Sequence, residues 1–171
     1  GTYTINTNDC KPSIGECSYL DTNTASTSVT GNNQLIIRNQ SKARLTAANL
    51  IGNKSATISN CKVVINANSY DMSLSGGSAT VDNVVIDSAI NTAATFTVTD
   101  SRGITTSKDI NITMLDWTLP TAIINLHRQH NFYSESDINV NAGYSSIDGK
   151  NAIEIKTRYK KINEGGYSGY I

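Results

Sequence analysis

The feature that most constrains this chain is a series of short strand-like segments with turn residues between them. From residue 34 to residue 117 these segments follow one another at intervals of about eight to twelve residues, a spacing typical of all-β domains. Asn, Ser and Thr supply roughly a third of the chain; Asn and Ser interrupt helices, whereas Thr and Val favour strands. We therefore expect an all-β fold in which two sheets form a sandwich.

The clearest pair of strands covers residues 95–99 and 104–115. Phe96 and Val98 alternate with threonines in the first of them, which predicts one buried and one solvated face. Between the two strands, Asp100-Ser101-Arg102-Gly103 favours a hairpin turn, because Asp and Ser can bond their own backbone and Gly103 allows a positive φ. The other strands expected in this domain cover residues 34–39, 42–47, 62–66, 69–74 and 80–86.

Two changes of pattern divide the chain into three parts. We expect residues 1–33, with one strand at 2–6, to form an extended N-terminal arm or linker, and residues 34–117 to form the sandwich. Pro120 marks the next boundary, because it cannot donate a hydrogen bond to a ladder. Residues 118–171 form a second β-rich unit that is too short for a whole sandwich of about 100 residues. We expect it to be the start of a second sandwich, cut short or completed by a partner.

The second unit again contains strand-like segments. They cover residues 122–126, 138–142 and 153–159, and Asp148-Gly149 is a turn signal between the last two. The first residue of the chain is Gly rather than Met, so we interpret the sequence as a piece of a longer protein.

The charges of the chain balance. Lys and Arg number 14, as do Asp and Glu, so the net charge is zero. Binding to the phosphate backbone of a nucleic acid requires an excess of clustered positive charge, so we expect no nucleic-acid binding. The sequence has no apolar run long enough to span a membrane and no basic start followed by an apolar stretch, so we expect no membrane contact.

The three cysteines are Cys10, Cys17 and Cys61, an odd number that does not fit the framework of a small disulfide-rich domain. A bridge between Cys10 and Cys17 would close a short loop that contains Pro and Gly. The alternative is free thiols in a reducing cytoplasm. Metal ligation is disfavoured, because there is no Cys-x-x-Cys pair and the two histidines, His127 and His130, lie far away in sequence.

The order of several segments carries a resemblance to a known family. These segments are residues 21–23, 30–37, 39–46, 96–106 and 110–117, followed by Arg128, residues 145–151 and residues 156–160. The chain resembles the tail structural proteins, also described as minor structural or receptor-binding proteins, of siphophages that infect streptococci and related Gram-positive bacteria. The resemblance implies immunoglobulin-like (Ig-like) sandwiches that act as spacers in a tail fibre or baseplate and support or display a host-binding module. The three cysteines depart from the family pattern, and Trp117 stands where a tyrosine is expected.

The resemblance also implies partners and a location. We expect other tail or baseplate proteins as partners and the virion as the location, after assembly in the cytoplasm of the bacterial host. Tail fibres are commonly trimeric, so a homotrimer is one expected assembly, although the strands show no coiled-coil repeat. A bacterial surface adhesin repeat with the same sandwich is an alternative.

No motif for catalysis stands out in the sequence. There is no Gly-x-Ser-x-Gly, and no cysteine lies in an active-site signature. Carboxylate pairs such as Asp82 with Asp87, or Glu135 with Asp137, could cleave a glycoside on paper, but any chain with this many acids offers such pairs. We therefore expect a non-enzymatic protein without catalytic residues, metal or cofactor.

The tyrosines are the best candidates for a binding role. Five of them fall in the second unit: Tyr133, Tyr144, Tyr159, Tyr167 and Tyr170. Exposed aromatic faces beside polar groups are typical of sugar-binding sites, so Tyr133, Tyr144 and Tyr167 are candidate saccharide-binding residues. A carbohydrate-binding module that contacts polysaccharide of the host surface is therefore the alternative to a spacer.

Overall fold

The chain folds into two compact units. A computed structural model describes residues 7–128, 136–160, 163 and 165–170. Unit 1 extends to Thr118 and unit 2 begins at Leu119, next to the boundary expected from Pro120. The strand expected at residues 2–6 lies outside the described residues.

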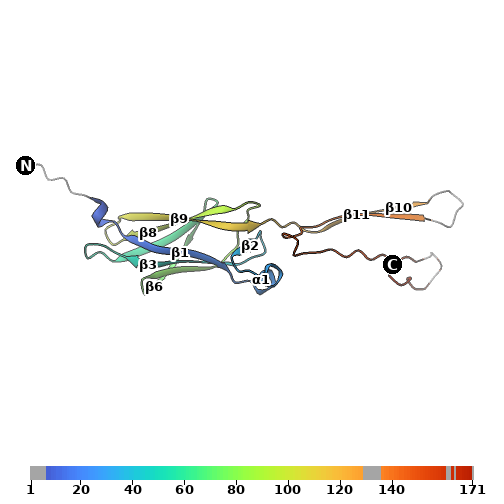
Figure 1. Ribbon diagram of the computed structural model, residues 1–171, viewed down its shortest axis with the longest axis horizontal. Coiled ribbons are helices and arrows are strands. Elements are labelled where there is room, and N and C mark those ends of the chain that lie inside the picture. The colour runs from blue at the N-terminus through green and yellow to red at the C-terminus, as the bar shows by residue number, and fades with distance from the viewer. Residues whose placement is uncertain (1–6, 129–135, 161–162, 164, 171) are drawn as a thin grey trace, which may run out of the picture. The chain divides into compact units, whose positions relative to one another are not determined.

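Unit 1 is a sandwich of two β-sheets (Figure 1). The first sheet holds β1 (Ser13–Asp21), β3 (Ala43–Ile51), β7 (Ser78–Val84) and β6 (Ser73–Ser75), in that order. The second sheet holds β2 (Leu35–Ile37), β9 (Thr105–Leu115), β8 (Thr92–Asp100), β4 (Ile58–Ile65) and β5 (Asn68–Asp71), in that order. Neighbouring strands are antiparallel except β2, which pairs parallel with β9. The expected all-β sandwich is confirmed.

The core lies between the two sheets, and alternation along the strands produces it. In β8 every second residue is buried from Ala94 onward, so Phe96 and Val98 point inward and the threonines between them do not. Leu45 of β3 and Val63 of β4 are equally buried and pack in the same cluster. The buried face predicted from the alternation of Phe96 and Val98 is confirmed.

The hairpin turn between β8 and β9 is confirmed as well. The Gly103 amide donates to the Asp100 carbonyl at 2.9 Å, and the Asp100 amide donates to the Ile104 carbonyl at 3.0 Å. Gly103 has φ 83°, the left-handed conformation that favours glycine at this position.

The strand expected at residues 69–74 is broken at Met72. Residues on its N-terminal side form β5 in the second sheet, and those on its C-terminal side form β6 in the first. The Met72 side chain is buried and its sulfur lies 3.5 Å from the Cys61 sulfur. Met72 therefore anchors the chain in the core where it crosses from one sheet to the other.

The expectation that residues 1–33 form an extended arm or linker is wrong for most of that segment. A 3-10 helix covers Thr7–Cys10, and β1 forms the edge of the first sheet, paired with β3 from Ser13↔Ile51 to Asp21↔Ala43. Tyr19 ties β1 to the second sheet, because its hydroxyl accepts from the Thr113 amide at 3.0 Å. The polar residues 21–28 also belong to the sandwich, because Asp21 and Ser26 among them are buried.

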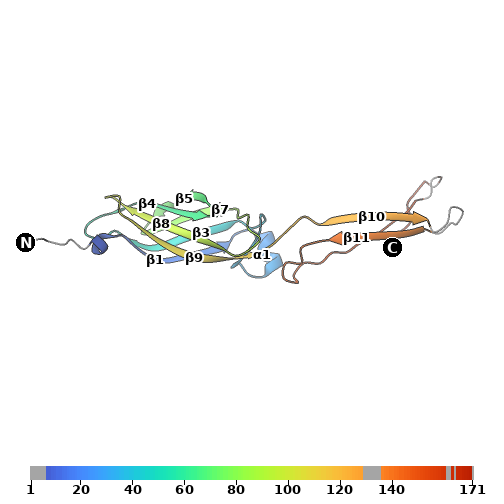
Figure 2. The same ribbon diagram turned by 90° about the horizontal axis from the view of Figure 1, so that it is seen from above.

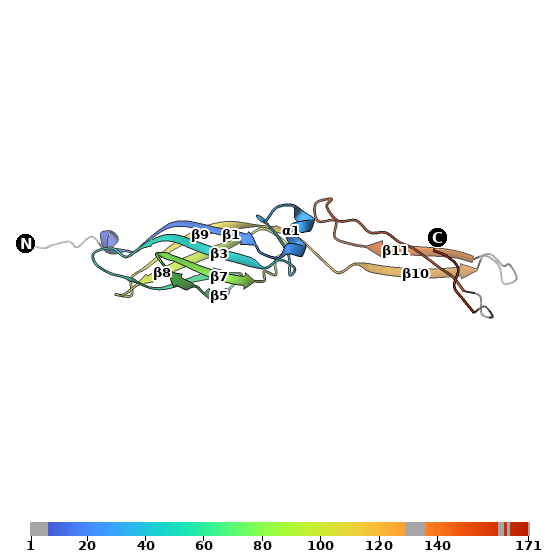
Figure 3. The same cartoon turned by 90° about the horizontal axis from the view of Figure 1, so that it is seen from below.

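Helix α1 (Thr24–Thr30) follows β1 at one end of the sandwich (Figure 3). Asn23 caps its N-terminus: the side-chain oxygen accepts from the Ala25 amide at 3.1 Å. Gly31 ends the helix with φ 66° and donates its amide to the Thr27 carbonyl. Serines and threonines are weak helix formers, so the two caps offset a poor composition. Helix α1 has seven residues and is the longest helix in the described part of the chain. No helix in that part is long and apolar enough to cross a membrane.

Strands β1 and β9 run in the same direction along the sandwich (Figure 2). The Thr106 hydroxyl at the start of β9 donates to the Pro12 carbonyl at 2.6 Å, and Thr113 near the end of β9 meets Tyr19 near the end of β1. Since β1 is the first strand of unit 1 and β9 the last, the chain enters and leaves the sandwich at opposite ends.

The strands described in unit 2 form a single ribbon. Strand β10 (Thr121–Arg128) pairs antiparallel with β11 (Ser136–Gly143), and the register places Ile124 opposite Val140 and Leu126 opposite Ile138. The turn expected at Asp148-Gly149 is present. Within the described residues of this unit there is no second layer of the expected sandwich.

The strand expected at residues 153–159 is wrong. These residues have no strand structure, and they do not belong to the sheet that β10 and β11 form. An alternating sequence pattern is not sufficient for a strand when no neighbour supplies ladder hydrogen bonds.

Candidate functional site

Two of the four carboxylates considered for glycoside cleavage, Asp82 and Asp87, are engaged in ion pairs. Asp82 pairs with Arg44 on the face of the first sheet. Asp87 pairs with Arg38 at 2.6 Å, and the hydrogen bond from Arg38 holds the pKa of Asp87 below its ordinary value. A general acid needs a raised pKa, so Asp87 is unsuited to that role. Of the other pair, Glu135 lies outside the described residues.

The described residues contain no group of three or more histidines, cysteines or carboxylates that could hold a metal ion. His127 lies at the exposed end of β10, opposite Asp137 in β11, and His130 lies outside the described residues. The side chains considered for metal ligation are therefore not brought together in this part of the chain.

All three cysteines are free thiols, so the bridge between Cys10 and Cys17 is not formed. Cys61 is fully buried in the core, and desolvation together with the nearby Cys17 raises the pKa of its thiol to about 11. Burial also raises the pKa of Cys17, although Lys108 lowers it in part. Nucleophilic cysteines need a lowered pKa, so Cys61 and Cys17 are structural rather than reactive groups.

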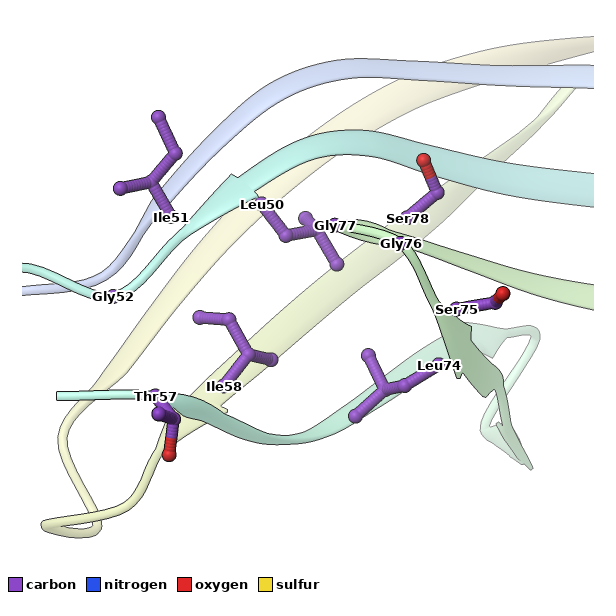
Figure 4. A pocket seen from close by; sticks show the side chains of 10 residues that line it. All are labelled: Leu50, Ile51, Gly52, Thr57, Ile58, Leu74, Ser75, Gly76, Gly77 and Ser78. Atoms are coloured by element: carbon purple, nitrogen blue, oxygen red, sulfur yellow. The ribbon is translucent and has the colours of Figure 1, made fainter.

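One open hollow of about 440 Å³ lies in unit 1, between the end of β3, the start of β4 and the β6–β7 hairpin (Figure 4). The side chains of Leu50, Ile58 and Leu74 point into it, whereas Ile51 points away. None of its ten lining residues is ionisable. The hollow can accept apolar groups. Thr57, Ser75 and Ser78 bring hydroxyl groups to its lining, but no ionisable lining side chain stands beside them to act as a base.

A second groove, of about 500 Å³, lies in unit 2. We call it the ribbon groove; it is lined by Ile124, Leu126, Ile138, residues 156–160 and Tyr170. The register of the ribbon explains its apolar side, because Ile124, Leu126 and Ile138 share one face of β10 and β11. Leu126 is 72% exposed and Ile124 is 65% exposed, so this face is open to a ligand.

The three tyrosines predicted to bind a saccharide differ in their position relative to the ribbon groove. Tyr133 lies outside the described residues. Tyr144 is 42% exposed but does not line the ribbon groove. Tyr167 is 61% exposed and contacts a groove residue, Arg158.

Arg158 was not predicted as a binding residue, yet its guanidinium contacts two tyrosine rings at this site. Its guanidinium carbon lies 4.5 Å from the ring centroid of Tyr167 and 5.4 Å from that of Tyr170. Lys160 lies 5.9 Å from the Tyr167 ring. These distances are typical of cation–π contacts. The signal in the sequence is the alternation of cations at Lys156, Arg158 and Lys160 upstream of two tyrosines.

No protein-family model matches this sequence, and no curated protein sequence matches it either.

Proposed function

We propose that this chain is a non-catalytic structural module of a phage tail fibre or baseplate. In this proposal unit 1 is a rigid Ig-like spacer that supports or displays a host receptor-binding module. The protein would be located in the virion, with other tail or baseplate proteins as partners. The resemblance of the segment order to siphophage tail proteins motivates this assignment.

The observation that carries the spacer role is the path of the chain through unit 1. Because β1 and β9 run in the same direction, the chain enters the sandwich at one end and leaves it at the other. A domain with this path adds its full length to a tandem array. A domain whose ends meet on one side would add much less.

The strand order supports the Ig-like assignment. Strands β1, β3, β7 and β6 correspond to the A-B-E-D sheet of Ig-like sandwiches, and β9, β8 and β4 to the G-F-C sheet. The outer face of β8 and β9 carries hydroxyl groups such as those of Thr97 and Ser107, which lie 2.8 Å apart. A hydrated surface with little charge suits a spacer, because it offers no large patch for non-specific association.

Immunogold electron microscopy tests the assignment. An antibody raised against this protein should label the tail of virions produced by the phage that encodes it. Label on the bacterial cell surface, with virions unlabelled, would identify an adhesin repeat instead. Hydrolysis of host wall glycan that a single carboxylate substitution abolishes would contradict the non-catalytic role.

A second candidate function is carbohydrate binding by unit 2, favoured by the ribbon groove. Tyr159 and Tyr170 line this groove and are 53% and 64% exposed, so both offer ring faces to a sugar. Titration with purified cell-wall polysaccharide separates the two functions: saturable binding that Tyr170→Ala weakens supports the module, and absence of binding leaves the spacer alone.

A further inference from the structure

The charged side chains that line the ribbon groove, among the described residues, are all cations. Lys156, Arg158 and Lys160 line it, and no carboxylate is among its lining residues. Glu154 pairs with Lys156 at 3.0 Å, but both side chains are more than half exposed. Such exposed pairs are weak and exchange readily with a competing anion. Arg158 and Lys160 form no ion pair with any described residue. The groove therefore has positive charge that is available to a ligand.

Tyr167 and Tyr170 hold the Arg158 guanidinium in place. Contacts with two rings restrict the arginine rotamers before a ligand arrives, which lowers the entropy that binding would cost. Ring stacking uses the face of a guanidinium and leaves its N–H groups at the edge. Those groups can donate two parallel hydrogen bonds to one carboxylate or phosphate.

The groove also has surfaces for the rest of a ligand. Ile124, Leu126 and Ile138 form its apolar side, and the Tyr159 ring is exposed beside them. Its volume lies within the range of small-ligand sites, about 300–1,000 Å³. A ligand that fits carries an anionic group for Arg158 and a ring with C–H groups for the tyrosine and aliphatic surfaces.

We infer that the ribbon groove binds an anionic saccharide, and that Arg158, held by Tyr167 and Tyr170, recognises its carboxylate or phosphate group. This inference rests on the carbohydrate-binding function proposed above and names the class of sugar. A neutral sugar would leave the cations unused. A nucleic acid would require more positive charge than a chain of net charge zero provides.

Calorimetric titration of the full chain with defined oligomers tests this inference. Hexagalacturonate supplies carboxylates, glucose 6-phosphate supplies a phosphate on a sugar, and inorganic phosphate supplies the anion alone. Maltohexaose is the neutral control of equal length, and a ten-residue oligothymidylate tests nucleic acid. We expect hexagalacturonate or glucose 6-phosphate to bind about tenfold more tightly than maltohexaose and inorganic phosphate, and added salt to weaken that binding.

Two variants and a matched control locate the site. Arg158→Gln should weaken binding of the anionic sugar about tenfold, and Arg158→Lys by less, because it keeps the charge but loses the planar fork. Lys150→Gln removes an exposed cation of the same unit that does not line the groove, and it should bind as the parent does. Circular dichroism verifies that each variant is folded, and the salt dependence of the parent chain tests the charge requirement without any substitution.

The other outcomes are distinct. Equal binding of maltohexaose and the anionic sugars would overturn the inference and leave carbohydrate binding standing. Absence of binding to every sugar would overturn both. Tighter binding of the oligothymidylate, or an unchanged affinity in Arg158→Gln, would also overturn the assignment of this groove to an anionic saccharide.

Discussion

Arg102 donates hydrogen bonds from Nε and Nη2 to the same oxygen, Oδ2, of Asp100, at 3.1 and 2.6 Å. The Asp100 carboxylate is fully buried, and its other oxygen accepts from the backbone amides of Arg102 and Ile104. Arg102 Nη2 also donates to the carbonyls of Cys10 and Asn53. One ion pair therefore joins the β8–β9 turn to the segment before β1 and to the loop before β4.

The pH dependence of folding should reveal this pair. Burial alone would raise the pKa of Asp100, but the hydrogen bonds from Arg102 and from the amides of Ile104 and Arg102 outweigh it and lower the pKa below 3.8. A carboxyl whose pKa is lower in the folded than in the unfolded state stabilises the fold above the unfolded value, and this contribution is lost as the pH falls through the folded value. We expect the urea concentration at the midpoint of unfolding to decrease once the pH drops below about 4.

Asp100→Asn is the matched variant for this measurement. It should be less stable than the parent at pH 7, and its urea midpoint should change less between pH 5 and pH 2. Asp87 affects the pH dependence of stability in the same direction, because Arg38 lowers its pKa. Its side chain is exposed, however, and water screens the ion pair, so its contribution is smaller. An identical pH profile for the parent and Asp100→Asn would show that Asp100 does not contribute.

A second buried carboxylate, Asp21, joins β1 to the turn before β3. Its oxygens accept from the Ser41 hydroxyl at 2.6 Å and from the amides of Asn23 and Lys42 at 2.8 and 3.0 Å. Asp21→Ala leaves these donors without an acceptor in a buried site, so we expect a loss of about 3 kcal/mol in the free energy of unfolding. Urea unfolding followed by circular dichroism measures it.

Asp82→Ala is the control for Asp21→Ala, because it also removes an aspartate that is bonded to another side chain. The partner of Asp82 is Arg44, and that of Asp21 is the Ser41 hydroxyl. The pair of Asp82 with Arg44 is about half exposed on both sides, so its removal should cost much less. Equal losses in the two variants would contradict the role assigned to the buried carboxylate.

The β8–β9 hairpin could be predicted from the sequence because its information is local. Phe96 and Val98 mark the buried face, and the turn residues lie directly between the two strands. Strand β1 could not be predicted from the sequence, because Gly15 and Glu16 interrupt its apolar pattern and its partner β3 begins more than twenty residues later. A strand whose pairing is long-range needs tertiary contacts to identify it.

Helix α1 and the ribbon groove were missed for different reasons. Asn23 and Gly31 are recognisable cap residues, but the polar residues between them indicated a linker. Tyr167 was identified by its residue type, whereas Arg158 becomes significant only when the fold brings it against the Tyr167 ring. Composition identifies candidate ring faces, and only three-dimensional contacts show which cation stacks on them.

Thiol labelling should distinguish the buried cysteine from the others. With a pKa of about 11, only about one Cys61 thiol in a thousand is ionised at pH 8, and the side chain has no exposed surface. We expect iodoacetamide to modify Cys10, which is partly exposed, while Cys61 reacts only in urea. Mass spectrometry of tryptic peptides measures both sites in one sample, and modification of Cys61 at the same rate with and without urea would contradict the structure.

Unit 1 should fold without unit 2, because the whole hydrophobic cluster of the sandwich comes from residues before Thr118. A chain that ends at Thr118 should keep the urea midpoint of the sandwich in the full chain. Phe96→Ala removes the largest fully buried side chain and should cost about 3–5 kcal/mol in either chain. Equal losses in the two chains would mean that Phe96 and unit 2 are energetically independent. A Phe96→Ala loss that changes when unit 2 is removed would mean that unit 2 contributes to the stability of the sandwich.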